Sequence, residues 1–164
     1  MAKFTYDDVI MEIREAVEKF FEADEIKHEP FDEHNIAHAG FAVKSRFGHV
    51  NVFFHALKDR LLIRTYLPLK AGVEERAKVG EFLLRANYGL KFGCFDFDFD
   101  DGEISYRTTI YCGSDEFEPP TYEQIDFALM VGILTVDRYG DALAKVIFGL
   151  VEPEDAIESV EDND

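Results

Sequence analysis

The 164-residue chain has the length of one domain, and its 47% of apolar residues exclude an intrinsically disordered chain. Acidic residues number 34 against 17 Lys and Arg, which gives a net charge of −17. A field of that sign repels phosphate, so we expect neither nucleic acid nor an anionic membrane surface among its partners.

A first helix is predicted to begin after Thr5. Thr5 followed by Asp8 has the spacing of a side-chain cap at a helix N-terminus. Pro30 prevents the helix from continuing far along the chain. Apolar residues recur behind the cap at helical spacing: Val9, Ile10, Ile13, Val17, Phe20 and Phe21.

Three strands are predicted next, at residues 36–45, 50–57 and 61–67. Each alternates apolar and other residues, which is typical of a strand with one buried face. The short turn between the last two strands brings Phe54 opposite Ile63 and puts both apolar sets on one face. We therefore expect an antiparallel meander.

A second helix is predicted from Val73 to Tyr88. Gly89 is expected to end it in the left-handed conformation that glycine adopts readily. Gly80 lowers the stability of a helix, so we expect it to permit close packing against another backbone.

Residues 92–112 predict a β-hairpin around a two-residue turn at Asp101–Gly102. This turn places Phe97 opposite Tyr106. Three phenylalanines then form an inner apolar face, while the interleaved aspartates meet solvent. The inward residues are Phe95, Phe97 and Phe99.

The last helix is predicted to begin after Pro119–Pro120, where Thr121 and Gln124 form a capping box. Apolar residues surround most of this helix, so we expect the sheet and another helix or subunit to cover it. Gly149 and Pro153 are expected to end it.

The order of these elements predicts a single α+β domain at residues 1–151, followed by a solvated acidic tail at residues 152–164. Its architecture is a helix, a three-stranded antiparallel meander, a helix, a β-hairpin and a long C-terminal helix. We expect a cytoplasmic protein, because residues 1–8 do not resemble a signal peptide and two cysteines are too few for a secreted disulfide scaffold.

Two patterns suggest metal binding, and neither meets the requirements of a site. Asp96-x-Asp98-x-Asp100 resembles the start of a calcium loop, but the sixth and twelfth positions are not the required Gly and Glu. His34 and His38 have the ligand spacing of a helix, yet on a strand they would lie about 13 Å apart. We expect no metal or cofactor site.

Catalytic motifs are likewise missing from the sequence. Cys94 and Cys112 fall on opposite faces of the predicted hairpin, which excludes a disulfide between them. There is no nucleophile elbow, phosphate loop or dinucleotide-binding glycine motif. We expect no catalytic residues, although one sequence leaves a composite active site open.

The outer face of the second and third predicted strands is more apolar than a solvated face requires. An apolar patch rimmed by polar groups marks an interaction surface, and the second helix covering this face is an equal alternative. The candidate protein-binding residues are Phe53, His55, Leu57, Leu62, Arg64 and Tyr66.

Several stretches also resemble a known family. They are Leu84–Asn87, Gly93–Asp96, Asp101–Ile104 and Tyr106–Arg107, with Asp137–Leu143 and Val146–Gly149 in the last helix. In these the chain resembles the YbjN family, whose fold is similar to that of type III secretion chaperones. The resemblance implies a homodimer that binds protein, with a general role as a sensory-transduction regulator and without established catalytic residues.

The leading hypothesis is therefore a non-catalytic, chaperone-like or regulatory module that binds a protein partner as a homodimer, for example by strand addition at a sheet edge. One alternative is a small metal-dependent enzyme or metal-binding protein that uses the histidine-rich strands. Another is an acidic DNA-mimic inhibitor, which would bind a basic protein.

Overall fold

The computed structural model describes residues 5–112 and 118–162. It confirms the predicted α+β class. The elements follow in the order α1 (Tyr6–Ala23), β1 (His28–Glu29), β2 (Ile36–Ala42), β3 (His49–Ala56), β4 (Arg60–Tyr66), α2 (Arg76–Gly89), β5 (Cys94–Phe97), β6 (Ile104–Tyr111), α3 (Tyr122–Ile147) and α4 (Pro153–Glu161).

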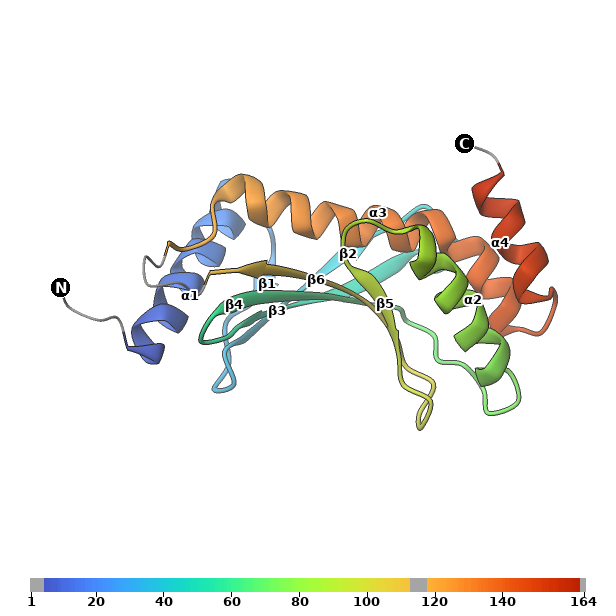
Figure 1. Cartoon of the computed structure of the whole chain (residues 1–164). Helices are drawn as coiled ribbons and strands as arrows, with labels where there is room; N and C mark the ends of the chain where they lie inside the picture. The colour runs from blue at the N-terminus through green and yellow to red at the C-terminus, as the bar shows by residue number, and fades with distance from the viewer. Residues whose placement is uncertain (1–4, 113–117, 163–164) are drawn as a thin grey trace.

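The strands form one antiparallel six-stranded sheet in the order β1-β2-β3-β4-β6-β5. The predicted meander is confirmed as β2–β4, with Phe54 opposite Ile63. The short β1 was not predicted, because a two-residue strand is too short to show a period. In Figure 1 the long α3 lies along one face of the sheet, with α1 near one end and α2 and α4 at the other.

The core lies between the sheet and these helices. Alternate strand residues are buried, and Val52, Phe54 and Ile63 are at most 1% exposed. Both predicted capping boxes are confirmed, at Thr5 for α1 and at Thr121 for α3. Each cap supplies hydrogen bonds for backbone N–H groups that the first helical turn leaves without partners.

The second helix differs from its prediction at both ends. It begins at Arg76 rather than Val73, and its first residues receive no side-chain cap. Gly89 is the last helical residue and does not adopt the left-handed conformation, so the predicted glycine cap is wrong.

The β5–β6 hairpin keeps the predicted faces but not the predicted register. Phe97 lies opposite Ile104, two residues away from the predicted Tyr106. The cause is a loop longer than two residues. In it, the Asp98 N–H donates to the Glu103 carbonyl.

The inner face of the hairpin is partly as predicted. Because two residues are one strand period, Phe95 still faces inward and is buried. Phe97 is half-buried, whereas Phe99 falls in the loop and is 59% exposed, which contradicts its inward orientation. A Cβ atom on Gly80 would lie 2.6 Å from Cζ of Phe99, so this glycine permits close packing against a ring and not against a backbone.

The C-terminal segment is not a solvated tail over its described part. Residues 153–161 form α4, which packs against α2 and α3. Ala156 and Ile157 are buried there, and the exposed acidic residues cover the opposite side of the helix. Asn163 and Asp164 lie outside the described residues.

The predicted cover of α3 by the sheet and by another helix is confirmed. α3 packs on β4 and β6 and is also contacted by α1, α2 and α4. Phe127 and Leu134 nevertheless remain 51% and 58% exposed among the described residues.

Candidate functional site

The face of the sheet opposite the core carries no helix from the described part of the chain (Figure 1). α2 packs beside β5 and against α3 and α4, so it does not cover the outer face. All six candidate residues lie on this face and are half-buried: Phe53 and His55 on β3, Leu57 just after it, and Leu62, Arg64 and Tyr66 on β4. We call this surface the open face.

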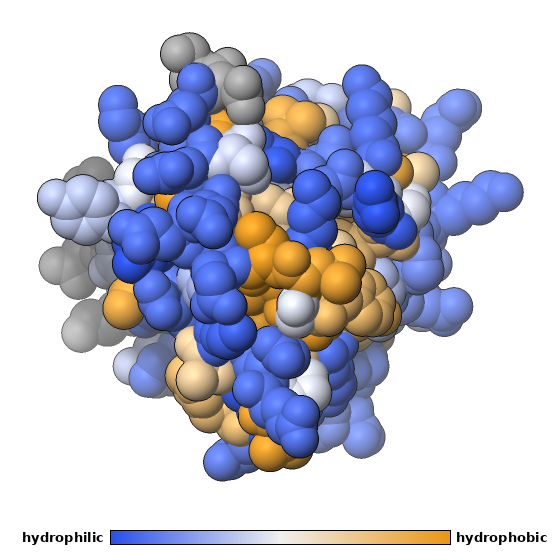
Figure 2. Space-filling model, turned by 90° about the vertical axis from the view of Figure 1, so that its right-hand side faces the viewer, coloured by the Kyte–Doolittle hydropathy of each residue, from blue (hydrophilic) through white to orange (hydrophobic). Residues whose placement is uncertain are grey.

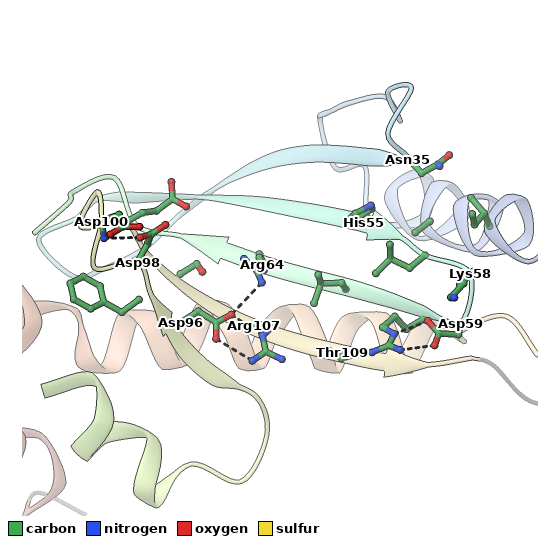
Figure 3. Close-up of a pocket in the computed structure, with 18 of the residues that line it drawn as sticks. Asn35, His55, Lys58, Asp59, Arg64, Asp96, Asp98, Asp100, Arg107 and Thr109 are labelled. Atoms are coloured by element: carbon green, nitrogen blue, oxygen red, sulfur yellow. Dashed lines mark hydrogen bonds and ion pairs between the residues drawn. The ribbon is translucent and has the colours of Figure 1, made fainter. Parts of the chain in front are cut away.

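Two grooves run along β4 on the open face and share His55, Leu62, Arg64 and Glu103 in their linings. The larger, the β6-side groove, has a volume of about 1030 Å³ and extends from the β3–β4 turn to the β5–β6 loop (Figure 3). The smaller, the β3-side groove, has a volume of about 540 Å³ and is lined by Phe53 and Tyr66. Volumes of this order hold several side chains of a ligand.

The floor of the β6-side groove carries the Arg64–Asp96–Arg107 cluster (Figure 3). Arg107 donates to both carboxylate oxygens of Asp96, from Nε at 2.7 Å and from Nη2 at 3.1 Å. Nη2 of Arg64 lies 3.5 Å from Oδ2 of the same carboxylate. Two guanidinium groups therefore share one carboxylate, and the cluster keeps one excess positive charge.

The cluster sets the protonation of its members. Partial burial alone would raise the pKa of Asp96, but the hydrogen bonds from Arg107 and the charges of both arginines outweigh it and lower that pKa. The hydrogen bonds to Asp96 raise the pKa of Arg107. Asp96 is therefore ionised and Arg107 is charged at neutral pH.

An aromatic group lies beside this cluster. Phe53 is the cross-strand neighbour of both His38 and Arg64. The ring of His38 stacks on Phe53 at 4.6 Å between centroids, and Tyr66 meets Phe53 edge-on at 5.3 Å. Nε2 of His38 lies 3.2 Å from the side-chain oxygen of Asn51. Apolar and charged subsites thus lie next to one another on the open face.

Sequence reasoning did not assign His38, Asn51, Asp96 or Arg107 to the candidate site. Only the registers of the five strands from β2 to β5 across the sheet bring these residues to the site. The alternation within each strand was the available signal, because it places all four on the outer side.

The metal and thiol patterns do not converge into a site. Among the described residues, no three His, Cys, Asp or Glu side chains are grouped to hold a metal ion. His34 lies exposed in the turn before β2, whereas His38 lies on that strand. Asp98 instead accepts a hydrogen bond from the Asp100 N–H at 2.8 Å.

Both cysteines are free, with Cys94 half-buried beside Asp96 and Cys112 buried. Burial raises the pKa of both thiols, so they are protonated at neutral pH. Within residues 5–112 and 118–162, no helix has both the length and the apolar character needed to cross a membrane.

Comparison with known proteins identifies the family. The YbjN profile, described as "Putative bacterial sensory transduction regulator", matches residues 14–145. The chain belongs to the YbjN family. This confirms the resemblance noted from the stretches of sequence above. No curated protein matches the chain.

A solved structure similar to this YbjN protein is the crystal structure of the ExsC–ExsE complex. The two chains are 15% identical with a TM-score of 0.49, and the match covers 81% of this chain and 93% of the other.

Proposed function

We propose that this YbjN protein is a non-catalytic, cytoplasmic regulator that holds an extended segment of a partner protein on its open face and acts as a homodimer. The observation that carries the proposal is the open face itself. A sheet normally buries its apolar side chains under another layer, yet here Phe53, Leu62 and Tyr66 line grooves that the described chain leaves uncovered.

The sheet edges favour binding on the face over strand addition. At the β5 edge, the Asn87 side chain accepts from the Phe95 N–H at 2.7 Å and donates to the Phe95 carbonyl at 3.0 Å. These are the groups that an added strand would use, so Asn87 blocks strand addition at Phe95. At the other edge, β1 already occupies His38 and Ala39 of β2.

The homodimer has a separate candidate contact. Figure 2 shows an apolar patch at the end of the molecule formed by α2 and α4. Val73, Phe148 and Leu150 are 64% to 74% exposed, and the Glu75 side chain, which lies against Gly149, brings their two loops together. We propose that two copies of the chain form the homodimer through this patch.

Affinity purification from the native host, read by mass spectrometry, tests the open face. Phe53→Asp and Tyr66→Asp are expected to lose the captured partner while circular dichroism still shows a folded protein. Tyr88→Asp is the matched control, since Tyr88 is 96% exposed on α2, away from the grooves. Unchanged capture by both open-face variants would refute the proposal.

Light scattering after size-exclusion chromatography tests the homodimer. The expected mass is about twice 18.8 kDa, and Leu150→Asp should reduce it to that of one chain. A wild-type monomer at high concentration would exclude the homodimer, and a dimer that persists in the variant would exclude the patch.

A further inference from the structure

The middle of the open face holds two neighbouring arginines that share one carboxylate, although the whole chain is strongly acidic. Arg64 and Arg107 are cross-strand neighbours, and Asp96 is the carboxylate that both contact among the described residues. Nε of Arg64 is buried and has no hydrogen-bond partner in the described structure. The Arg64 side chain as a whole is 37% exposed and its contact with Asp96 is 3.5 Å long, so the chain does not saturate this guanidinium and a ligand that supplies an acceptor is favoured here.

One of these arginines lies in the lining that the two grooves share. Arg64 lines both of them, with Leu62 on one side along β4 and Tyr66 on the other. Outward residues of a strand repeat about every 6.6 Å, and a bound segment in the extended conformation has the same repeat. A segment that follows β4 therefore presents every second side chain to Leu62, Arg64 and Tyr66 in turn.

Resting on the proposed function, we infer that the partner's extended segment carries an Asp or Glu side chain that binds Arg64 and Arg107, with an apolar side chain two residues to either side. One apolar side chain enters the β3-side groove against Phe53 and Tyr66, and the other packs on Leu62 beside His55. The carboxylate neutralises the excess charge of the cluster.

The net charge of the chain does not oppose this arrangement at short range. Charges beyond about 8 Å are largely screened at physiological ionic strength, so a ligand carboxylate in contact with the two guanidinium groups interacts mainly with them and with the carboxylates of the same groove. Of these, Glu103 is itself paired with Lys70 at 3.7 Å. A carboxylate also accepts paired hydrogen bonds from guanidinium groups, which are stronger than those between neutral groups. A Lys or Arg of the partner would instead meet two like charges at this position.

The experiment measures binding of three fluorescein-labelled peptides with blocked ends to the full chain. The first has the sequence Ser-Leu-Ser-Glu-Ser-Phe-Ser, and the others carry Gln or Lys in place of Glu. We expect the Glu peptide to bind about tenfold more tightly than the Gln peptide, because charge-assisted hydrogen bonds are lost. The preference should weaken as salt is added.

Variants locate the effect. Arg64→Gln is expected to abolish the preference for Glu over Gln. Arg85→Gln, which removes the same charge from an ion pair with Glu81 on α2, should retain it. Thermal melting of each variant checks that the fold is intact. Equal affinity for Glu and Gln, or tighter binding of Lys, would overturn the inference.

Phe53→Asp separates this inference from the proposed function. If the Glu and Gln peptides bind equally and Phe53→Asp removes both, the carboxylate subsite is wrong while the binding face stands. If none of the peptides binds, the inference is wrong, and the proposed function is decided by partner capture from the host.

Discussion

The two faces of one sheet differ in what their side chains do. Phe54 and Phe53 are neighbours on β3, yet Phe54 is fully buried against Phe21 of α1 and Phe53 lines an uncovered groove. Along a strand, a step of one residue moves a side chain from one face to the other. The same eight-residue strand therefore contributes to the core with one set of residues and to a binding surface with the other.

Substitution of these neighbours tests the comparison most strongly. Phe54→Ala is expected to cost about 3–5 kcal/mol of unfolding free energy, because it removes a buried ring and leaves a cavity. Phe53→Ala should cost less than half as much, since its ring is partly hydrated already. Urea unfolding of both variants measures the difference. Similar losses would show that the open face also belongs to the core.

The β5 edge of the sheet extends the comparison to the backbone. Asn87→Ala leaves the Phe95 N–H and carbonyl without their side-chain partner, and we expect a loss of about 1–3 kcal/mol in urea unfolding. Asn87→Asp keeps the acceptor for the N–H but lacks the donor for the carbonyl, so its loss should be intermediate. An Asn87→Ala variant as stable as the wild type would show that solvent satisfies this edge equally well.

Among these tests, the titration of His55 should change the unfolding free energy least. Burial on the open face lowers the pKa of His55 below its ordinary value of 6.5. The folded state thus favours the neutral imidazole, and this contribution to stability is complete above pH 6.5 and is lost as the pH falls through the folded-state pKa.

Unfolding free energies measured from about pH 8 to about pH 5 test this point. His55→Gln should lose less stability on acidification than the wild type. His49→Gln, which replaces an exposed histidine at the start of β3, is the control and should follow the wild-type curve. Parallel curves for the wild type and His55→Gln would contradict the effect.

Local patterns predicted most elements and missed those whose cause is not local. The caps at Thr5 and Thr121 depend on residues three positions apart, so the sequence alone revealed them. The hairpin register depends on the loop from Asp98, whose conformation Arg76 of α2 supports by donating to the Phe99 and Asp100 carbonyls. Those hydrogen bonds join α2 to the β5–β6 loop. A prediction based on the two turn residues alone could not include them.

The same distinction holds for the open face. Alternation placed Phe53, His55, Leu62, Arg64 and Tyr66 on one side, and the structure agrees. The sequence could not decide whether α2 covers them. An amphipathic pattern shows that one side of a helix is buried, but it does not show which element buries that side. The acidic residues of α4 led to a wrong prediction for a similar reason, since its few apolar residues are buried by α2 and α3.

By itself, the sequence determined the strand faces, the helix caps and the resemblance to the YbjN family, because each depends on residues close together in the chain. It also showed that the catalytic motifs are missing, since each of them is a short local pattern. Only the tertiary structure decided that one face stays open and that Arg64, Asp96 and Arg107 meet on it. Those contacts join three strands, and their geometry depends on registers that long-range packing sets.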